Sequence, residues 1–349
     1  MHHRFLPASA VLAVCLLSGP AWARQEPSPA PASTPRAVQA ESAAALEAAP
    51  EKILVPGQRP GPGLWKVSKG EHVLWLFGTY SPLPQKMEWR SHEVETVIAQ
   101  SQEYLKEPSA STQMGFIRQL TLLPYAIGLK KNPDGAQLRD LVPADVYQRW
   151  LPLKAKYIGK DEGIEFERPI FAAETLYKKR LEFAGLTSGR EVLKAIEAVV
   201  KKHKLTTTSP EVKLALDNPV AMIKDFKKSS LDDVACFTSI LARLETDISA
   251  LLVRANAWAK GDVEAIRALD LGHEQVSCFD AMSNSNFVKG QPSLQNMRQR
   301  MDDAWLAAAE KSLATNASTF GVLPLRNILD PKGVLSALQA RGYTLTSPD

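Results

Sequence analysis

Two side chains with chemical potential follow predicted strands. Ser81 follows a glycine turn at the end of the apolar run His72–Phe77, and Glu107 ends the predicted strand Glu103–Glu107. A serine nucleophile needs a positioned base and an oxyanion hole. The sequence around Ser81 does not read Gly-x-Ser-x-Gly, and no histidine can be assigned as its base. Ser81 before Pro82 is therefore interpreted as a turn residue. Two interpretations of Glu107 stay open: a carboxylate of a functional site, or a solvent-exposed charge at the end of a strand.

The histidines are interpreted as surface or capping residues and not as metal ligands. His72 begins a strand, and His92 lies early in a helix. His203 ends a lysine-rich helix, where a cation suits the helix dipole. His273 precedes an acidic residue near a predicted helix start.

The cysteines predict a disulfide. Removal of a leader that contains Cys15 leaves Cys236 and Cys278. Two cysteines in an oxidising compartment favour pairing, although two buried thiols are the alternative. The bond would close a loop of about 43 residues, worth roughly 4 kcal/mol in the chain-entropy model. Two cysteines alone cannot close a tetrahedral zinc site.

The first 23 residues have the features of a secretory signal peptide. A basic start is followed by the apolar run Leu6–Leu17 and by Ala21-Trp22-Ala23, which fits a cleavage site. The run is too short to span a bilayer. An uncleaved anchor and a lipoprotein attached through Cys15 are the alternatives. We therefore expect cleavage after Ala23, a periplasmic or secreted protein, and no transmembrane segment in the mature chain.

Composition excludes one class of partner. A net charge of +4 on 349 residues is a small surplus, and no basic stripe with interleaved aromatic residues is present. We therefore expect no nucleic-acid partner. Residues 24–51 are rich in Ala, Pro, Ser and Glu, which predicts a flexible linker. Residues 52–349 are predicted to form a single domain.

Strands are predicted mainly at the two ends of this domain. A short strand at Ile53–Val55 precedes a hairpin of Leu64–Val67 and His72–Phe77, with Lys69-Gly70 at the turn. Both faces of the second hairpin strand are apolar, which predicts a central strand covered on both sides. The strands Thr319–Leu323 and Tyr343–Thr346 are predicted near the C-terminus.

Helices are predicted between these ends. Apolar residues at three- and four-residue spacing predict a mostly helical region over about 113–316. Its helices are Asp145–Tyr157, Ile170–Phe183, Arg190–His203, Leu231–Trp258, a short helix capped by Gly261-Asp262, and one with a core stripe of Met297, Met301 and Trp305. Outside this region we expect a helix at Arg90–Gln100, and a last one with Asp330 as N-cap, Pro331 at its first position and Gly342 at its end.

Three stretches carry a resemblance to a known family. They are Gly63 to Arg90 with Trp65, Gly78, Pro84 and Trp89; Ala257-Trp-Ala-Lys-Gly-Asp262 before an apolar helix; and Phe320 to Tyr343 with Gly333-Val-Leu and Arg341-Gly-Tyr343. In this order they resemble the TraB/GumN family over about residues 52–346. The resemblance implies an α/β (α+β) fold: a small mixed sheet formed from the N- and C-terminal parts, with a large helical middle.

The family resembles Tiki-type metallopeptidases, and this implies where a metal site would lie. Those proteins carry two Gly-x-x-His motifs, one near each end of the domain, and an acidic residue after the second core strand. In this sequence the histidine positions fall on Ser81 and Asn327, and the acidic position falls on Glu107. Both imidazoles are therefore absent. Further cleft candidates are Gly78, Arg326 and Arg300, with an Arg300–Glu107 pair across the cleft as a hypothesis.

This replacement has a chemical consequence. Neutral hydroxyl and amide oxygens are weak ligands for zinc, manganese or cobalt, so Ser81, Glu107 and Asn327 offer at most one anionic ligand. We expect no cofactor, although the family would imply a divalent metal; a hard ion with oxygen ligands is the alternative.

The sequence thus predicts an exported pseudoenzyme, related to metallopeptidases, that binds a peptide, an envelope polymer such as a polysaccharide, or an envelope protein. The alternatives are a metal-dependent hydrolase that uses Glu107 as its catalytic residue with a non-standard ion site, and a purely structural periplasmic factor.

Overall fold

The N-terminal hairpin forms the centre of the sheet. This computed structural model describes residues 62–348 apart from 88, 90, 232, 247 and 269–281. In it, β1 (Leu64–Lys69) pairs antiparallel with β2 (His72–Thr79). Lys69 pairs with His72, so the two-residue turn is Gly70-Glu71, one position later than predicted. Gly70 has a φ of 62°, a left-handed conformation that glycine adopts without a steric penalty. The predicted signal peptide, the linker and the strand Ile53–Val55 lie outside the described residues.

The sheet is mixed and joins both ends of the domain, as predicted. Its strand order is β10-β1-β2-β9-β4-β7. β10 (Thr344–Thr346) pairs antiparallel with β1, whereas β2, β9 (Ser318–Pro324), β4 (Glu103–Leu105) and β7 (Thr206–Thr208) run parallel. The edge strand β7 comes from the middle of the chain and was not predicted, because Thr206–Thr208 lacks apolar residues.

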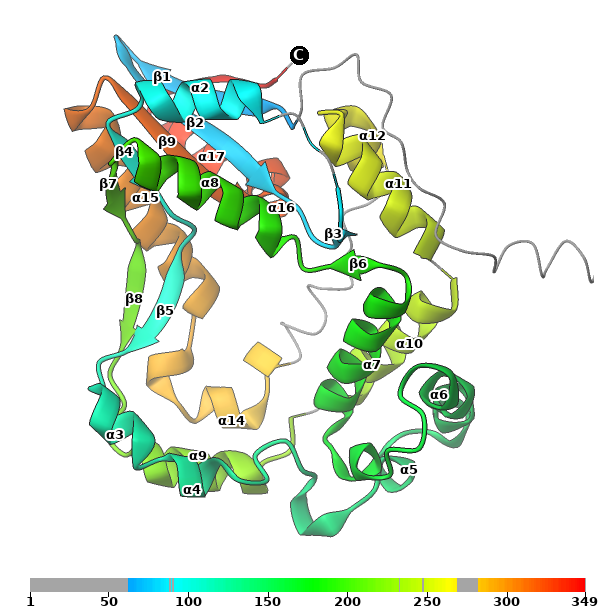
Figure 1. Cartoon of the computed structure of the whole chain (residues 1–349). Helices are drawn as coiled ribbons and strands as arrows, with labels where there is room; N and C mark the ends of the chain where they lie inside the picture. The colour runs from blue at the N-terminus through cyan, green and yellow to red at the C-terminus, as the bar shows by residue number, and fades with distance from the viewer. Residues whose placement is uncertain are drawn as a thin grey trace, which may run out of the picture. The chain divides into compact units, whose positions relative to one another are not determined.

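Helices cover the sheet on both faces (Figure 1). α2 (His92–Gln100) and α8 (Arg190–Lys202) lie on one face, and α15 (Met297–Thr315), α16 (Leu325–Leu329) and α17 (Val334–Ala340) lie on the other. Leu74, Leu76 and Phe77 of β2 are fully buried, which confirms a strand covered on both sides. Trp305 of α15 is also fully buried, as its predicted core role requires.

The end of the chain differs from its prediction. The last helix begins after Gly333, not at Asp330, whose Oδ1 instead accepts a hydrogen bond from the Lys332 amide in a turn. The separate helix α16 follows β9 directly. Gly342 has a φ of 83° just beyond the last helix, which is the C-terminal geometry predicted for it.

A second apolar core lies within the helical middle. It is built around Trp150 of α6 (Ala144–Tyr157) and Phe237 of α10 (Val234–Thr246), which pack against α7 (Pro169–Phe183). The predicted helix Leu231–Trp258 is two helices, α10 and α11 (Ile248–Ala259). The remaining short elements are β3 (Leu83–Pro84), α5 (Leu138–Leu141), β6 (Leu186–Thr187), α12 (Val263–Ala268), α14 (Asn286–Lys289), η1 (Pro133–Gly135), η2 (Gly163–Phe166) and η3 (Pro292–Leu294).

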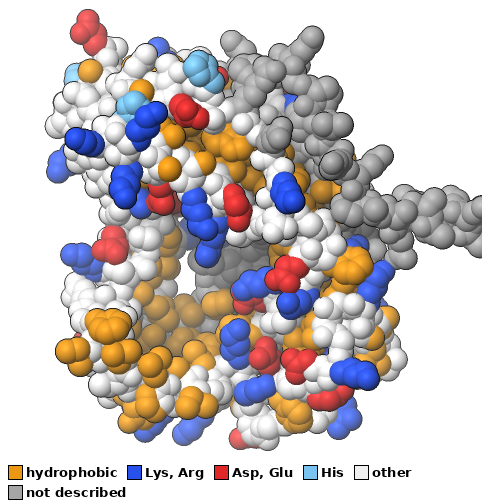
Figure 2. Space-filling view, viewed as in Figure 1, with side chains coloured by type: hydrophobic (Ala, Val, Ile, Leu, Met, Phe, Trp, Pro, Cys, Tyr) orange, Lys and Arg blue, Asp and Glu red, His pale blue; other side chains and the backbone are white. Residues whose placement is uncertain are grey.

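A two-stranded arm extends from β4 and β7. β5 (Ser109–Thr112) and β8 (Glu211–Leu214) pair in parallel, and their far end leads to α3 (Phe116–Leu120), α4 (Leu123–Ala126) and α9 (Pro219–Lys228) (Figure 1). Figure 2 shows apolar side chains gathered over this end, at the lower left of the view. None of the described helices is long and apolar enough to cross a membrane.

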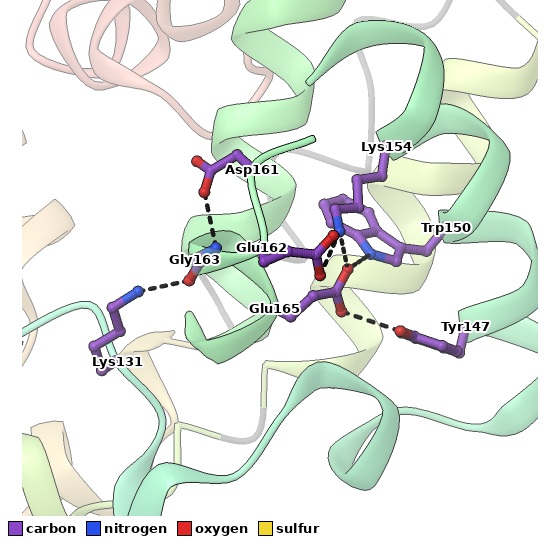
Figure 3. Close-up of polar contacts among 8 residues, drawn as sticks. All are labelled: Lys131, Tyr147, Trp150, Lys154, Asp161, Glu162, Gly163 and Glu165. Carbon is purple, nitrogen blue, oxygen red and sulfur yellow. Dashed lines mark hydrogen bonds and ion pairs between the residues drawn. The ribbon is translucent and has the colours of Figure 1, made fainter. Parts of the chain in front are cut away.

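A buried ion pair stabilises the second core (Figure 3). Lys154 Nζ lies 3.1 Å from Glu165 Oε1, and both side chains are at most 10% exposed. Glu165 also accepts hydrogen bonds from Trp150 Nε1 at 2.9 Å and from the Tyr147 hydroxyl at 3.2 Å. Glu162 lies 3.6 Å from Lys154 at the solvent edge. Removing one partner of a buried ion pair leaves an uncompensated charge in the core, which is strongly destabilising.

Candidate functional site

A cavity of about 370 Å³ lies at the carboxyl ends of the three central parallel strands. Chain segments that follow β2, β4 and β9 meet the start of α8 and two side chains from α10 and α11. The lining residues are Thr79, Tyr80, Ser81, Glu107, Ser188, Gly189, Arg190, Leu193, Arg243, Arg254, Pro324, Leu325 and Arg326. Open α/β sheets bind ligands at this edge, because successive strands leave a crevice outside their carboxyl ends.

The strand ends are fixed by close packing. A methyl group placed on Gly78 would lie 2.7 Å from Leu325 Cδ1, so a larger residue there would require the Leu325 side chain to move. Trp258 Nε1 donates a hydrogen bond of 2.7 Å to the Gly78 carbonyl oxygen. The rings of Trp258 and Trp89 pack around Phe77, with centroids 5.9 and 5.6 Å from it. The three stretches that carry the family resemblance therefore meet behind the cavity.

Glu107 is held in place by a residue from β2, on the other side of β9. Thr79 Oγ1 donates a 2.5 Å hydrogen bond to Glu107 Oε1 across the ends of β2 and β4. The side chain of Glu107 is half-buried. A charged acceptor strengthens such a hydrogen bond, so Thr79 fixes the position of a carboxylate that lines the cavity.

Four guanidinium groups line the same cavity. They belong to Arg190 at the start of α8, Arg243 on α10, Arg254 on α11 and Arg326 on α16. Glu107 is the one carboxylate among the described residues of the lining. The cavity wall therefore carries a surplus of positive charge, which favours an anionic occupant.

The electrostatics of Arg326 reflect this surplus. Partial burial lowers the pKa of its guanidinium below the ordinary value, and the nearby charge of Arg298 lowers the pKa further. Glu107 acts in the opposite direction, which places Arg326 within the field of that carboxylate. On the far wall, Arg243 lies over the Tyr177 ring at 5.7 Å from its centroid. Burial raises the pKa of Tyr177, whereas Arg243 and Arg254 act to lower it.

The start of α8 packs directly on the turn that follows β2. Gly189 has a φ of 71°, and a methyl group there would lie 2.7 Å from the Tyr80 carbonyl oxygen. The Ser81–Pro82 peptide bond in this turn is cis. Ser188, Gly189 and Arg190 thus reach the cavity because the helix begins in contact with the turn.

The structure brings some predicted site residues together and separates others. Ser81, Glu107 and Arg326 line one cavity, with Gly78 immediately behind it. Asn327 follows on α16 but is not among the lining residues, and Gly333 packs against its backbone carbonyl. Arg300 also lies outside the lining; its Nη1 donates to the Ser293 carbonyl at 2.7 Å. Glu107 accepts a hydrogen bond from Thr79, so the hypothesis of an Arg300–Glu107 pair across the cleft gains no support.

The arginines of the far wall were missed by sequence reasoning. Arg243 and Arg254 lie on helices that were predicted for their apolar residues alone, and only the tertiary fold brings them to the strand ends. For Ser188-Gly189-Arg190, a glycine before a predicted helix was an available signal. Cys236 is fully buried on α10, while Cys278 lies outside the described residues, so their pairing stays a prediction.

The donor groups of the cavity do not suit a transition metal. His72, His92 and His203 lie outside its lining; His72 Nδ1 contacts the Asn316 carbonyl oxygen at 2.7 Å. The side-chain oxygens of the lining residues at the strand ends belong to Glu107 and to the hydroxyl groups of Thr79, Tyr80 and Ser81. Within the described part of the chain, no three His, Cys, Asp or Glu side chains are grouped so as to hold an ion. One carboxylate beside several guanidinium groups disfavours a bound cation.

The fold and the cavity define a class of protein: a three-layer α/β domain whose strand-end site is assembled from both ends of the chain. The chain belongs to the TraB/PrgY/gumN family, whose model matches residues 63–347. No curated protein and no solved structure matches the chain.

Proposed function

We propose that this protein is an exported, non-catalytic member of its family that binds a ligand in the strand-end cavity. The observation that carries the proposal is the lining itself: Ser81 offers a hydroxyl at one implied ligand position, Asn327 at the other is not in the lining, and four guanidinium groups share the cavity with Glu107. A metallopeptidase needs strong donors around its ion and an open coordination position. Glu107 is the one such donor at the strand ends, so binding is favoured over hydrolysis.

The charge of the lining indicates which ligand chemistry fits. The guanidinium group is planar and matches a carboxylate or phosphate with two parallel hydrogen bonds. Four such groups come from four different helices, so an anion entering the cavity meets them from several sides. A volume of about 370 Å³ accommodates a small ligand or the end of a longer one. Among the predicted ligands, the relation to peptidases favours a peptide with a free carboxylate over an acidic polysaccharide or an envelope protein.

Calorimetric titration with matched peptides tests this ligand class. Peptides that end in a free carboxylate are compared with the same peptides ending in an amide, using the intact protein. We expect the amides to bind at least about tenfold more weakly, because each loses a charge-assisted hydrogen bond. Equal affinities for both forms would contradict the anionic ligand.

Two cavity variants and one remote variant localise the binding. Arg326→Gln and Arg190→Gln are each expected to weaken the carboxylate peptides about tenfold while leaving the amides unchanged. Arg139→Gln on α5, an exposed arginine outside the cavity, is the matched control. Circular dichroism confirms that each variant is folded. If Arg139→Gln weakens binding as much as Arg326→Gln does, the site is elsewhere.

Hydrolysis through Glu107 is the rival function, because this carboxylate is oriented in the cavity by Thr79. Glu107→Gln separates the two. If a measured hydrolytic activity disappears from a folded Glu107→Gln protein, catalysis is established. Elemental analysis of protein purified without chelators is an independent check. One zinc or manganese per chain would contradict the binding proposal.

Export is supported by the leader-like sequence of residues 1–23. Cell fractionation followed by N-terminal sequencing tests it. We expect mature protein in the periplasm or medium with Arg24 as its first residue; protein retained in the cytoplasm with its leader intact would refute export.

A further inference from the structure

The end of the β5–β8 arm carries a concentrated group of exposed apolar side chains. This apolar tip consists of Phe116, Ile117, Leu120, Leu123, Tyr125 and Ile127. These are six of the twelve exposed large apolar side chains of the described residues, yet they fall within twelve positions of the chain. Ile117, Ile127 and Phe116 are 78, 76 and 73% exposed. Single exposed apolar residues are ordinary, whereas a contiguous group marks a surface that meets an apolar partner.

The arm gives the apolar tip a fixed position. The paired strands β5 and β8 connect it to the sheet, and α9 packs against α4 (Figure 1). Lys227 Nζ donates to the Ile127 carbonyl at 2.5 Å, which joins α9 to the chain that follows α4. The backbone of Ile127 is therefore fixed by a hydrogen bond while its side chain is exposed to solvent.

Basic side chains predominate at the tip. The helices α3 and α4 carry Arg118 and no acidic residue, and α9 carries Lys224, Lys227 and Lys228 with one acidic residue, Asp225. Lys224 of the adjoining helix α9 lies over the Tyr125 ring at 5.8 Å from its centroid. Basic side chains thus border the apolar tip, and Figure 2 shows lysine or arginine side chains along its lower edge.

We propose that the apolar tip docks the protein on the surface of a membrane that contains anionic lipids. Phe116, Ile117 and Ile127 would enter the boundary between headgroups and acyl chains, where exposed apolar side chains leave water. Tyr125 combines an apolar ring with a polar hydroxyl, as residues at this boundary do. Arg118 and Lys224 would lie among the phosphate groups, to which basic residues near a bilayer are attracted.

The charge pattern favours lipid over a second copy of the chain. In a symmetric dimer formed through the tip, Arg118 and Lys224 of one copy would be brought close to the same residues of the other. Like charges brought together across an interface oppose association. An anionic bilayer supplies the complementary charge and the apolar phase at the same place.

Co-sedimentation of the full chain with vesicles tests the proposal. One set of vesicles contains equal parts of phosphatidylglycerol and phosphatidylcholine, and the other contains phosphatidylcholine alone. We expect binding to the anionic set, reduced about tenfold when the salt is raised from about 0.1 M to about 1 M, because screening shortens the range of the attraction. Failure of the unmodified chain to sediment with the anionic vesicles would overturn the proposal.

Matched variants assign the binding to the tip. The double variant Phe116→Ser/Ile117→Ser should lower partitioning onto anionic vesicles at least about tenfold. Phe183→Ser removes an exposed phenylalanine from α7, outside the tip, and should leave partitioning unchanged. Equal partitioning of the double variant and the unmodified chain would overturn the proposal.

Two further measurements test the proposal even if the Phe116→Ser/Ile117→Ser variant is poorly folded. Arg118→Gln/Lys224→Gln should lower binding to the anionic vesicles severalfold and reduce its salt dependence; unchanged binding in this folded variant contradicts membrane docking. Analytical ultracentrifugation without lipid measures self-association. A dimer of the unmodified chain that Phe116→Ser/Ile117→Ser dissociates, with no vesicle binding, would assign the tip to a second copy instead.

Discussion

The indole Nε1 of Trp258 donates a 2.7 Å hydrogen bond to the carbonyl oxygen of Gly78, at the end of the central strand β2. The two residues are 180 positions apart, and both are buried. This bond connects the helical middle of the chain to the strand end that forms the cavity, so it contributes both to stability and to the shape of the site.

Trp258→Phe is expected to lower the free energy of unfolding by about 1–3 kcal/mol, because it leaves a buried carbonyl oxygen without its indole donor. Denaturant unfolding followed by circular dichroism measures the loss. Trp89→Phe is the control, since it trims the same aromatic cluster without affecting the Gly78 carbonyl. If both variants lose the same amount, the hydrogen bond contributes little and ring packing accounts for the stability.

Alanine substitutions at Gly185 and Gly189, two glycines with left-handed backbones, distinguish the cost of backbone strain from the cost of a steric clash. Gly189 (φ 71°) and Gly185 (φ 68°) have similar conformations, but a methyl group on Gly189 would lie 2.7 Å from Tyr80 O, whereas one on Gly185 has no atom within 4 Å. We expect Gly185→Ala to cost about 1 kcal/mol and Gly189→Ala about 1–3 kcal/mol more. Gly189→Ala should also weaken ligand binding by displacing the cavity wall. Thermal or urea unfolding of both variants measures the difference, and equal losses would show that α8 can move away from the turn.

Glu165 is expected to be a sensitive position in the second core. Glu165→Gln leaves the buried Lys154 ammonium without its anionic partner and should lower the free energy of unfolding by about 3 kcal/mol. Glu162→Gln removes a carboxylate that also faces Lys154 but is 81% exposed, so it should cost less than about 1 kcal/mol. Urea unfolding of the two variants provides the comparison. Similar small losses would mean that water reaches Lys154 in the folded protein.

The ion pair also predicts a dependence on alkaline pH. Burial alone would lower the pKa of Lys154, but the hydrogen bond and charge of Glu165, together with Glu162, outweigh it and raise the pKa. A pKa raised by folding gives stability that is present below the ordinary lysine value and is lost as pH rises through the raised value. The stability difference between the unmodified protein and Lys154→Met should therefore shrink above about pH 10.5.

Unfolding free energies measured from about pH 8 to pH 11 test this dependence. Lys178→Met removes an exposed lysine from a surface pair with Glu174 and serves as the control. Its stability difference should stay nearly constant over the same range, because exposed pairs contribute little. A constant difference for Lys154→Met would contradict the raised pKa.

Local signals in the sequence were sufficient to predict much of the fold. The hairpin, the helix α2 and the strand β9 follow from alternation, spacing and turn residues. The Ala265 amide donates to Asp262 Oδ1 at 3.0 Å, which is the capping contact expected before α12. The polar strand β7 was not predictable, because its strand conformation depends on pairing with β4 and not on its own side chains.

The candidate site was predictable only at its strand ends. Ser81 and Glu107 could be placed because each follows a strand that the sequence identifies. The residue that lines the cavity after β9 could not be predicted. The helix α16 begins immediately after Pro324, and sequence spacing alone does not fix which of its residues faces the cavity. Arg326 lines the cavity, whereas Asn327 does not. Arg243 and Arg254 reach it through tertiary packing, which no local pattern reports.

The strand order has a consequence for when the protein can first function. Thr79 and Leu323, in contact through a 3.3 Å hydrogen bond from the threonine hydroxyl, are separated by 244 residues along the chain. A nascent polypeptide therefore lacks the strand-end cavity until β9 has left the ribosome and inserted between β2 and β4. The cavity at the strand ends is therefore completed late in synthesis, at the closure of the sheet, whatever occupies it afterwards.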